Sequence, residues 1–183
     1  MKQTTAQEKV KYQGLYDWMQ SIVTTFLAIV LLLTFAGRMI GVEHASMMPT
    51  LHDGDRMIIR TLLYSPSHED IIIFSTQSFR EGEALVKRVI GLAGDTIDID
   101  FDAGIVYRNG LALEESFVNA PTNLRGDVTF PQVVPPGHVF VLGDNRNSSA
   151  DSRNSDIGHI DEREIIGRVI AVITPINRAQ FFF

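Results

Sequence analysis

Hydrophobic and polar residues follow one pattern at the start of the chain and another in the rest of it. No residue from Trp18 to Gly37 is charged, and this stretch contains the apolar run "SIVTTFLAIVLLLTFAG". A helix of about 20 residues, rising about 1.5 Å per residue, spans the roughly 30 Å hydrocarbon core of a bilayer. The pattern therefore predicts a transmembrane anchor at residues 18–37, with Tyr16 and Trp18 at its interface.

Charges before this run indicate its orientation. Residues 1–17 contain three lysines and two acidic residues, namely Lys2, Lys9, Lys11, Glu8 and Asp17. The positive-inside tendency then places residues 1–17 in the cytoplasm and residues 38–183 on the other side of the membrane. Two alternatives remain open. The run can be a buried core helix, although it has no polar face, or a removable signal peptide, although it exceeds the usual apolar length of about 7 to 15 residues.

After the anchor, the apolar runs become short and rich in Val, Ile and Phe, and Gly, Asp, Pro or Asn residues bound them. Such runs predict strands of a mainly β, antiparallel domain. We expect a tight hairpin at Asn109-Gly110, because a type I′ turn needs positive φ at both central residues. Prolines in the less apolar stretch 101–136 indicate a small inserted lobe. The predicted strands lie in residues 55–64, 70–76, 84–92, 95–102, 104–113, 138–144 and 165–175.

Composition removes several classes of function. The net charge of −6 and the absence of a basic stripe argue against nucleic acid as the main partner. The chain has no cysteine, so it has no disulfide, no thiol nucleophile and no cysteine-ligated metal. A serine nucleophile with a lysine base, the chemistry that the next residues point to, needs neither a metal nor a cofactor.

Two residues could form a nucleophile and its base. Ser46 lies about eight residues beyond Arg38, among apolar neighbours, and a serine hydroxyl needs a nearby base to become nucleophilic. Lys87 is flanked by branched aliphatic residues, so desolvation should lower the pKa of its amine from about 10.4 toward neutrality. A neutral lysine is a competent general base. Taken singly, each residue also fits a structural role, Ser46 as an ordinary turn serine and Lys87 as a lysine that reaches water from a half-exposed strand.

A third candidate segment is "GDNRNSSADSR", residues 143–153, directly after a strand-like run. Its three serines and four charged residues are suited to orient buried polar groups, although an ordinary turn closed by ion pairs fits them too.

These three segments behind one anchor, with the motifs "SMMPTL", "KRVIGLAGD" and "GDNRNSSADSR", resemble the bacterial type I signal peptidase family. Its members are membrane-bound Ser-Lys serine proteases that remove signal peptides from exported proteins. The resemblance runs from the anchor to about Arg168. It implies a β-rich catalytic core of two antiparallel sheets with a small inserted lobe. The implied partners are signal peptides of secretory preproteins and the lipid bilayer, and the oligomeric state stays unknown.

The resemblance also implies roles for individual residues. Ser46 matches the acylating nucleophile, Lys87 its general base, and Ser149 the serine that hydrogen-bonds the lysine amine. Met47 would pack beside the dyad and the small side chains of the substrate. The charged frame of the loop would be formed by Asp144, Arg146, Asp151 and Arg153.

His44 departs from the pattern of some family members, which have serine two positions before the nucleophile. On an extended segment His44 and Ser46 share a face, so an imidazole N–H could be a second oxyanion donor beside the backbone N–H of Ser46. A surface histidine near the membrane is the alternative.

Three rival functions stay open. A self-cleaving repressor of the DNA-damage response has a similar Ser-Lys dyad, but it is cytosolic and normally carries a DNA-binding domain. An anchored β domain that only binds partners would have lost the dyad, whereas this sequence retains both residues. A serine hydrolase whose base is histidine would not depend on Lys87.

Overall fold

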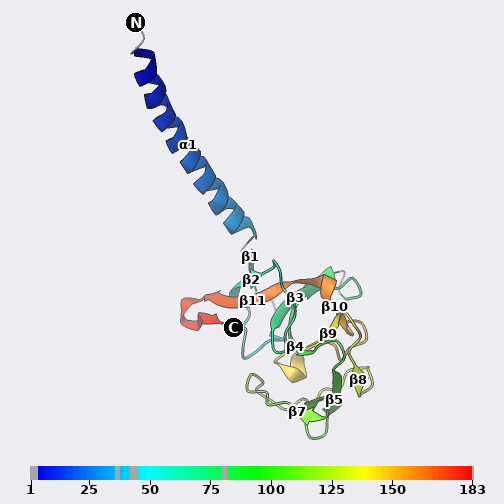
Figure 1. Cartoon of the computed structure of the whole chain (residues 1–183). Coiled ribbons are helices and arrows are strands. Elements are labelled where there is room, and N and C mark those ends of the chain that lie inside the picture. Colours follow the sequence, from blue (N-terminus) through cyan, green and yellow to red (C-terminus); the bar gives the residue numbers. More distant parts are fainter. Residues whose placement is uncertain (1–3, 36–37, 42–44, 80–81, 183) are drawn as a thin grey trace. The chain divides into compact units, whose positions relative to one another are not determined.

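The structure is a computed structural model, and it describes residues 4–35, 38–41, 45–79 and 82–182. The chain divides into two compact units, residues 1–37 and 38–183. The first unit contains one long helix, α1 (Thr4–Phe35), which begins well before the predicted anchor (Figure 1). Residues 36 and 37, the end of that predicted anchor, lie outside the described residues. Within the described part of the chain, no helix is both long and apolar enough to cross a bilayer.

The second unit is mainly β and contains two antiparallel sheets, which confirms the predicted β-rich, two-sheet core (Figure 1). Among the described residues the larger sheet has eight strands in the order β1-β2-β11-β3-β4-β9-β10, with β12 paired to β11. The strands are β1 (Arg38–Gly41), β2 (Arg56–Arg60), β3 (Ile71–Ser75), β4 (Ala84–Gly91), β9 (His138–Leu142), β10 (Ile160–Asp161), β11 (Ile165–Thr174) and β12 (Gln180–Phe181). The very short strands and β1 had no clear signal in the sequence.

Buried side chains on both faces explain why the central strands of this sheet read as continuous apolar runs. All of Ile71, Ile72, Ile73 and Phe74 on β3 are buried. Ile71 and Ile73 pack with Met47, whereas Ile72 and Phe74 pack with Val89 of β4. The two faces of β3 therefore contribute to two separate hydrophobic clusters, and β4 pairs with β3 in the sheet between them.

The smaller sheet lies in the middle of the sequence and has the order β7-β6-β5-β8. Its core residues Ile97, Ile99 and Val106 pack against Ile90 of β4 and Phe140 of β9, so the two sheets share a third hydrophobic cluster. The strands are β5 (Thr96–Asp100), β6 (Ile105–Arg108), β7 (Leu111–Ala112) and β8 (Gln132–Val133). β5 thus begins a few residues before the stretch 101–136 that the sequence indicated as a lobe.

The predicted hairpin is confirmed, since β6 and β7 pair across Asn109 and Gly110, whose φ angles are 55° and 78°. Asp95 holds the base of this hairpin by accepting hydrogen bonds from Asn109 Nδ2 (2.7 Å) and the backbone N–H of Leu92 (2.8 Å). Burial raises the pKa of the Asp95 carboxyl, but hydrogen bonds from His68, Leu92 and Asn109 outweigh it and hold the pKa below its ordinary value.

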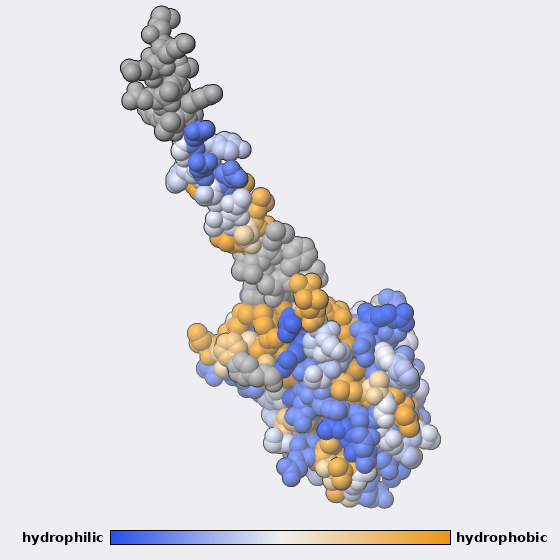
Figure 2. Space-filling model, viewed as in Figure 1, coloured by the Kyte–Doolittle hydropathy of each residue, from blue (hydrophilic) through white to orange (hydrophobic). Residues whose placement is uncertain are grey.

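The surface of the second unit is not uniform. On the face shown in Figure 2, hydrophobic residues gather over the region of β2 and β11, and the surface around β5 and β7 is more hydrophilic. Leu62 and Leu63, which follow β2, are exposed, and Ile176 and Phe181, which follow or end the β11 hairpin, are exposed as well.

Candidate active site

Ser46 and Lys87, 41 residues apart in the sequence, meet in the structure. The Lys87 amine donates a hydrogen bond of 2.8 Å to Ser46 Oγ and another of 2.9 Å to the carbonyl of Val86. Lys87 lies on β4 and is only 2% exposed, whereas Ser46 is half-buried. The arrangement therefore joins a hydroxyl that faces the surface to an amine that is nearly removed from water.

The residues after Ser46 hold its backbone in place. Residues 46–50 form a turn closed by a hydrogen bond of 2.9 Å from Leu51 N to Met47 O. Met47 and Leu51 are fully buried in the cluster that includes Ile71 of β3. The apolar character of "SMMPTL" thus anchors the turn in the core and leaves the serine at its edge. Met47 contributes to this core, and its predicted role in a substrate pocket stays a prediction.

The loop after β9 closes over the backbone of the Ser46 turn. Asn145 donates from its backbone N–H to Ser46 O (3.0 Å) and from Nδ2 to Ala45 O (3.0 Å). Gly143 lies so close that a Cβ there would be 2.6 Å from Ser46 O. Asn145 and Gly143 were not predicted as site residues, because asparagine and glycine are common in any turn.

Ser149 lies next to this contact. The same Cβ on Gly143 would be only 2.2 Å from Ser149 Oγ, so Ser149 and the Ser46 backbone flank one glycine. Ser149 is buried, and its hydroxyl donates a long hydrogen bond of 3.4 Å to Ala150 O. A hydrogen bond between Ser149 and the Lys87 amine stays a prediction.

The four charged residues predicted to frame the loop are all buried: Asp144, Arg146, Asp151 and Arg153. Asp151 and Arg153 pair with each other through two contacts of 2.8 Å, and Asp151 also accepts the Gly143 N–H at 3.0 Å. The other two charges pair outside the loop. Each needs a partner because an unpaired charge is costly to bury.

Arg88 and Glu115 are those partners, and neither was predicted. Arg88 makes two hydrogen bonds to the Asp144 carboxylate, of 2.8 and 2.6 Å. Arg146 does the same with Glu115, at 2.7 and 2.6 Å. A signal for Arg88 was present, since an arginine between apolar strand residues requires a buried acid. Glu115 had no signal, because it lies in a polar segment between strands.

His44, the predicted second oxyanion donor, lies outside the described residues. Within the described residues, no group of three or more His, Asp and Glu side chains is placed to hold a metal ion.

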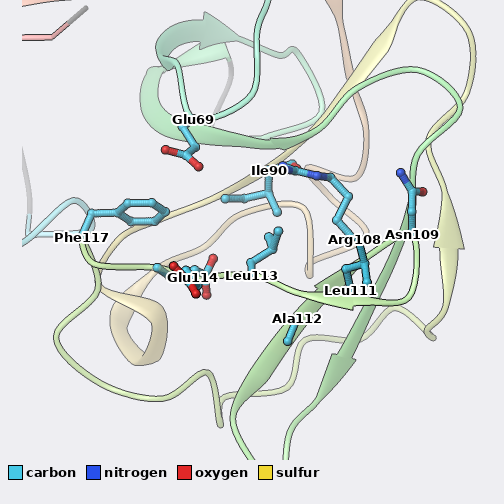
Figure 3. Close-up of a pocket in the computed structure, with 10 residues that line it drawn as sticks. Glu69, Ile90, Arg108, Asn109, Leu111, Ala112, Leu113, Glu114 and Phe117 are labelled. Carbon is cyan, nitrogen blue, oxygen red and sulfur yellow. The ribbon is translucent and has the colours of Figure 1, made fainter.

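A pocket of about 460 Å³ lies on the side of β4 that carries Ile90, and neither Ser46 nor Lys87 lines it. Figure 3 shows Ile90 beside Leu113 and Phe117, with Glu69 and Arg108 at the sides of the pocket. Arg108 donates to the carbonyl of Ile90 at 3.0 Å, which ties β6 to β4.

The fold and the serine–lysine contact define a β-rich protein with the constellation expected of a serine peptidase that uses a lysine base. Residues 15–174 match the family described as "Signal peptidase, peptidase S26". The chain belongs to this family, which confirms the resemblance carried by the three motifs.

Curated relatives agree with this assignment. The chain is 37% identical over 172 residues to "Signal peptidase I" of Leptolyngbya laminosa, covering 87% of this chain and 81% of the relative. It is 34% identical over 181 residues to "Signal peptidase I" of Bacillus licheniformis, covering 93% and 94%. A crystal structure of a signal peptidase I from Enterococcus faecalis is 32% identical, with a TM-score of 0.46, and covers 57% of this chain and 97% of that chain.

Proposed function

We propose that this protein is a membrane-anchored serine endopeptidase that removes N-terminal signal peptides from translocated preproteins through Ser46 and Lys87. The observation that carries the proposal is the 2.8 Å hydrogen bond between the Lys87 amine and Ser46 Oγ. Membership of the signal peptidase family supplies the reaction and the class of substrate.

The environment of Lys87 suits a general base. Its side chain is 2% exposed on a strand of aliphatic residues, and burial disfavours the charged form of an amine. The neutral amine takes the proton of Ser46 Oγ as this oxygen attacks the scissile carbonyl. The protonated Lys87 then gives its proton to the leaving amine, and an acyl-enzyme on Ser46 remains. Water, deprotonated by Lys87, then attacks the acyl-enzyme and releases the product, so the proposed steps need no metal or cofactor.

The loop that follows β9 has a supporting role in this proposal. Asn145 and Gly143 fix the backbone of the Ser46 turn, and the N–H of Ser46 would stabilise the oxyanion. Ser149 would orient the Lys87 amine. His44 stays a candidate for the second oxyanion donor.

The substrate would bind extended along a strand edge, with alternate side chains entering pockets. The resemblance to signal peptidases gives the expectation that small residues such as alanine occupy the first and third positions before the cut.

We also propose that residues 18–37 are retained as a membrane anchor, with residues 1–17 in the cytoplasm and residues 38–183 on the outer side. The support is the absence of charge from residue 18 to residue 37 and the excess of lysine before it. Such an anchor would keep the enzyme at the surface where translocated signal peptides emerge, raising its effective concentration toward them.

Incubation of the purified full chain in detergent with one labelled secretory precursor tests the function. Wild-type protein is expected to release a single fragment whose new N-terminus follows the signal peptide. Ser46→Ala is expected to lower the cleavage rate by at least about a thousandfold, because no acyl-enzyme can form. Unchanged cleavage by a folded Ser46→Ala protein would show that another nucleophile acts.

Reporter fusions test the orientation. A C-terminal reporter that is active only outside the cytoplasm is expected to be active, and one that works only in the cytoplasm is expected to be silent. The matched control places the same reporters before residue 1, where the outcome should reverse. A C-terminal reporter active in the cytoplasm would contradict the proposed topology.

A further inference from the structure

The segment between β7 and β8 touches the proposed active site through its charged residues. We call residues 113–122 of this segment the strap. It starts at Leu113, whose N–H donates to Val106 O of β6 at 2.9 Å, and it ends at Thr122, which is buried. Glu115 and Phe117 project from it toward two buried or nearly buried arginines of the larger sheet and its loop.

Glu115 binds Arg146 in a two-pronged ion pair. The distances are 2.6 Å from Nη2 to Oε1 and 2.7 Å from Nη1 to Oε2, and Nη1 also donates to Thr122 Oγ1 at 3.0 Å. The Arg146 side chain is fully buried and that of Glu115 is 9% exposed. Paired N–H···O bonds between planar charged groups fix both distance and orientation, so the strap determines where the guanidinium lies.

Arg146 in turn holds the glycine against which the Ser46 turn packs. Its Nε donates to Gly143 O at 3.0 Å, and the Gly143 N–H is held on its other side by Asp151 at 3.0 Å. A Cβ on Gly143 would be 2.6 Å from Ser46 O and 2.2 Å from Ser149 Oγ, so Gly143 packs closely against both the Ser46 carbonyl and the Ser149 hydroxyl. A displacement of Arg146 is therefore transmitted to the backbone of Ser46.

Phe117 provides a second contact on the same strap. Its ring lies 4.0 Å from the guanidinium carbon of Arg88, the residue that follows Lys87 on β4. Figure 3 shows Phe117 at one side of the pocket that Ile90 and Leu113 also line. The strap thus contacts the two elements that position the proposed dyad. Phe117 touches β4, which carries Lys87, and Glu115 binds the loop after β9, which packs on Ser46.

We propose that Glu115 is a positioning residue for peptide cleavage. It acts through Arg146 and Gly143 to hold Ser46 Oγ within hydrogen-bonding distance of the Lys87 amine. The proposal rests on the proposed function and gives the strap, which connects two strands of the smaller sheet, a part in it. Small displacements of reacting groups cost large factors in rate, of order a hundredfold for about 1 Å. The loss of Glu115 should therefore lower kcat while leaving KM close to its wild-type value, because the Glu115 carboxylate is 9% exposed and bound to Arg146, so it would act on Ser46 only through that residue.

The experiment measures kcat and KM for cleavage of one labelled precursor by the full chain in detergent, with thermal unfolding recorded for each variant. Glu115→Gln keeps the shape of the side chain but removes its charge, and its kcat is expected to fall about ten- to a hundredfold. Glu115→Asp keeps the charge but withdraws the carboxylate by one methylene, and it should lie between Glu115→Gln and wild type. The matched control is Asp102→Asn, which removes the exposed ion pair with Arg125 elsewhere on the inserted region and should change neither constant.

A double variant, Glu115→Leu with Arg146→Met, separates positioning from stability. Replacing a buried ion pair by apolar residues often preserves stability. We expect this variant to melt near the wild-type temperature and still show the lowered kcat, because the Nε donor to Gly143 is gone.

A double variant with wild-type kcat would overturn the proposal, and so would a folded Glu115→Gln with kcat within about twofold of wild type. Where Glu115→Gln does not fold, a wild-type kcat for Glu115→Asp would overturn it instead. Absence of cleavage by wild-type protein would contradict the proposed function, and this outcome is separate from all the others.

Discussion

Lys87→Met is expected to lower kcat for precursor cleavage by at least about a thousandfold, within the range reported for losing a general base. Methionine matches the length of the lysine side chain and is apolar, so it suits a position that is 2% exposed. It removes the amine that lies 2.8 Å from Ser46 Oγ and leaves the fold of β4 intact. Thermal unfolding close to that of wild type is the control for folding.

A chemical rescue sharpens this test, because the chain contains no cysteine. Lys87→Cys, unfolded, alkylated with a haloethylamine and refolded, regains a primary amine at nearly the same distance from the backbone. Cleavage should partly return with the aminoethyl group and should not return with an ethyl group of similar size. The introduced cysteine is the only one in the variant, so the new amine is assigned to position 87 without ambiguity. Full turnover by a folded Lys87→Met protein would favour the histidine-based alternative.

Gly143→Ala is expected to have the second large effect. The new Cβ would lie 2.2 Å from Ser149 Oγ and 2.6 Å from Ser46 O, and both distances are far below van der Waals contact. Because Ser46 O is a backbone atom held by the Asn145 N–H, it cannot swing aside as a flexible side chain would. We expect a loss of stability of about 1–3 kcal/mol from overpacking, together with a fall in kcat of at least about a hundredfold.

The matched control for this substitution is Gly41→Ala on β1. A Cβ on Gly41 would meet no atom within 4 Å, and its φ is not in the positive region, so the change should leave both stability and kcat near wild type. Differential scanning calorimetry and precursor cleavage measure the two quantities. Wild-type kcat in Gly143→Ala would show that the Ser46 turn tolerates displacement, which would also weaken the role proposed for Glu115.

Several elements could be predicted because their signals are local. Alternating and continuous apolar runs marked the main strands, and Asn109-Gly110 marked a hairpin whose two positive φ angles the structure confirms. The very short strands were not predicted, because a two-residue strand such as Gln132–Val133 (β8) is too short to show an alternating pattern. β1 was missed for a related reason, because four residues after a long apolar run do not stand out from it.

Pairing between distant charges was not predictable to the same degree. The motif loop marked Asp144 and Arg146 as structural charges, but their partners Arg88 and Glu115 lie 56 and 31 residues away along the chain. An ion pair between distant residues produces no local sequence pattern around either partner. Only the demand that a buried charge be compensated could have pointed to Arg88, and nothing local pointed to Glu115.

The sequence by itself determined the mainly β fold, the family through three ordered motifs, and the two residues proposed for catalysis. Hydrophobic periodicity and turn chemistry are properties of neighbouring residues, so they can be read without coordinates. The tertiary structure alone decided that the Lys87 amine lies 2.8 Å from Ser46 Oγ, that Gly143 leaves no room for a side chain beside the Ser46 carbonyl, and that Glu115 reaches Arg146 from the segment between β7 and β8. These contacts depend on how strands far apart in the chain pack together, and packing is settled by the whole molecule.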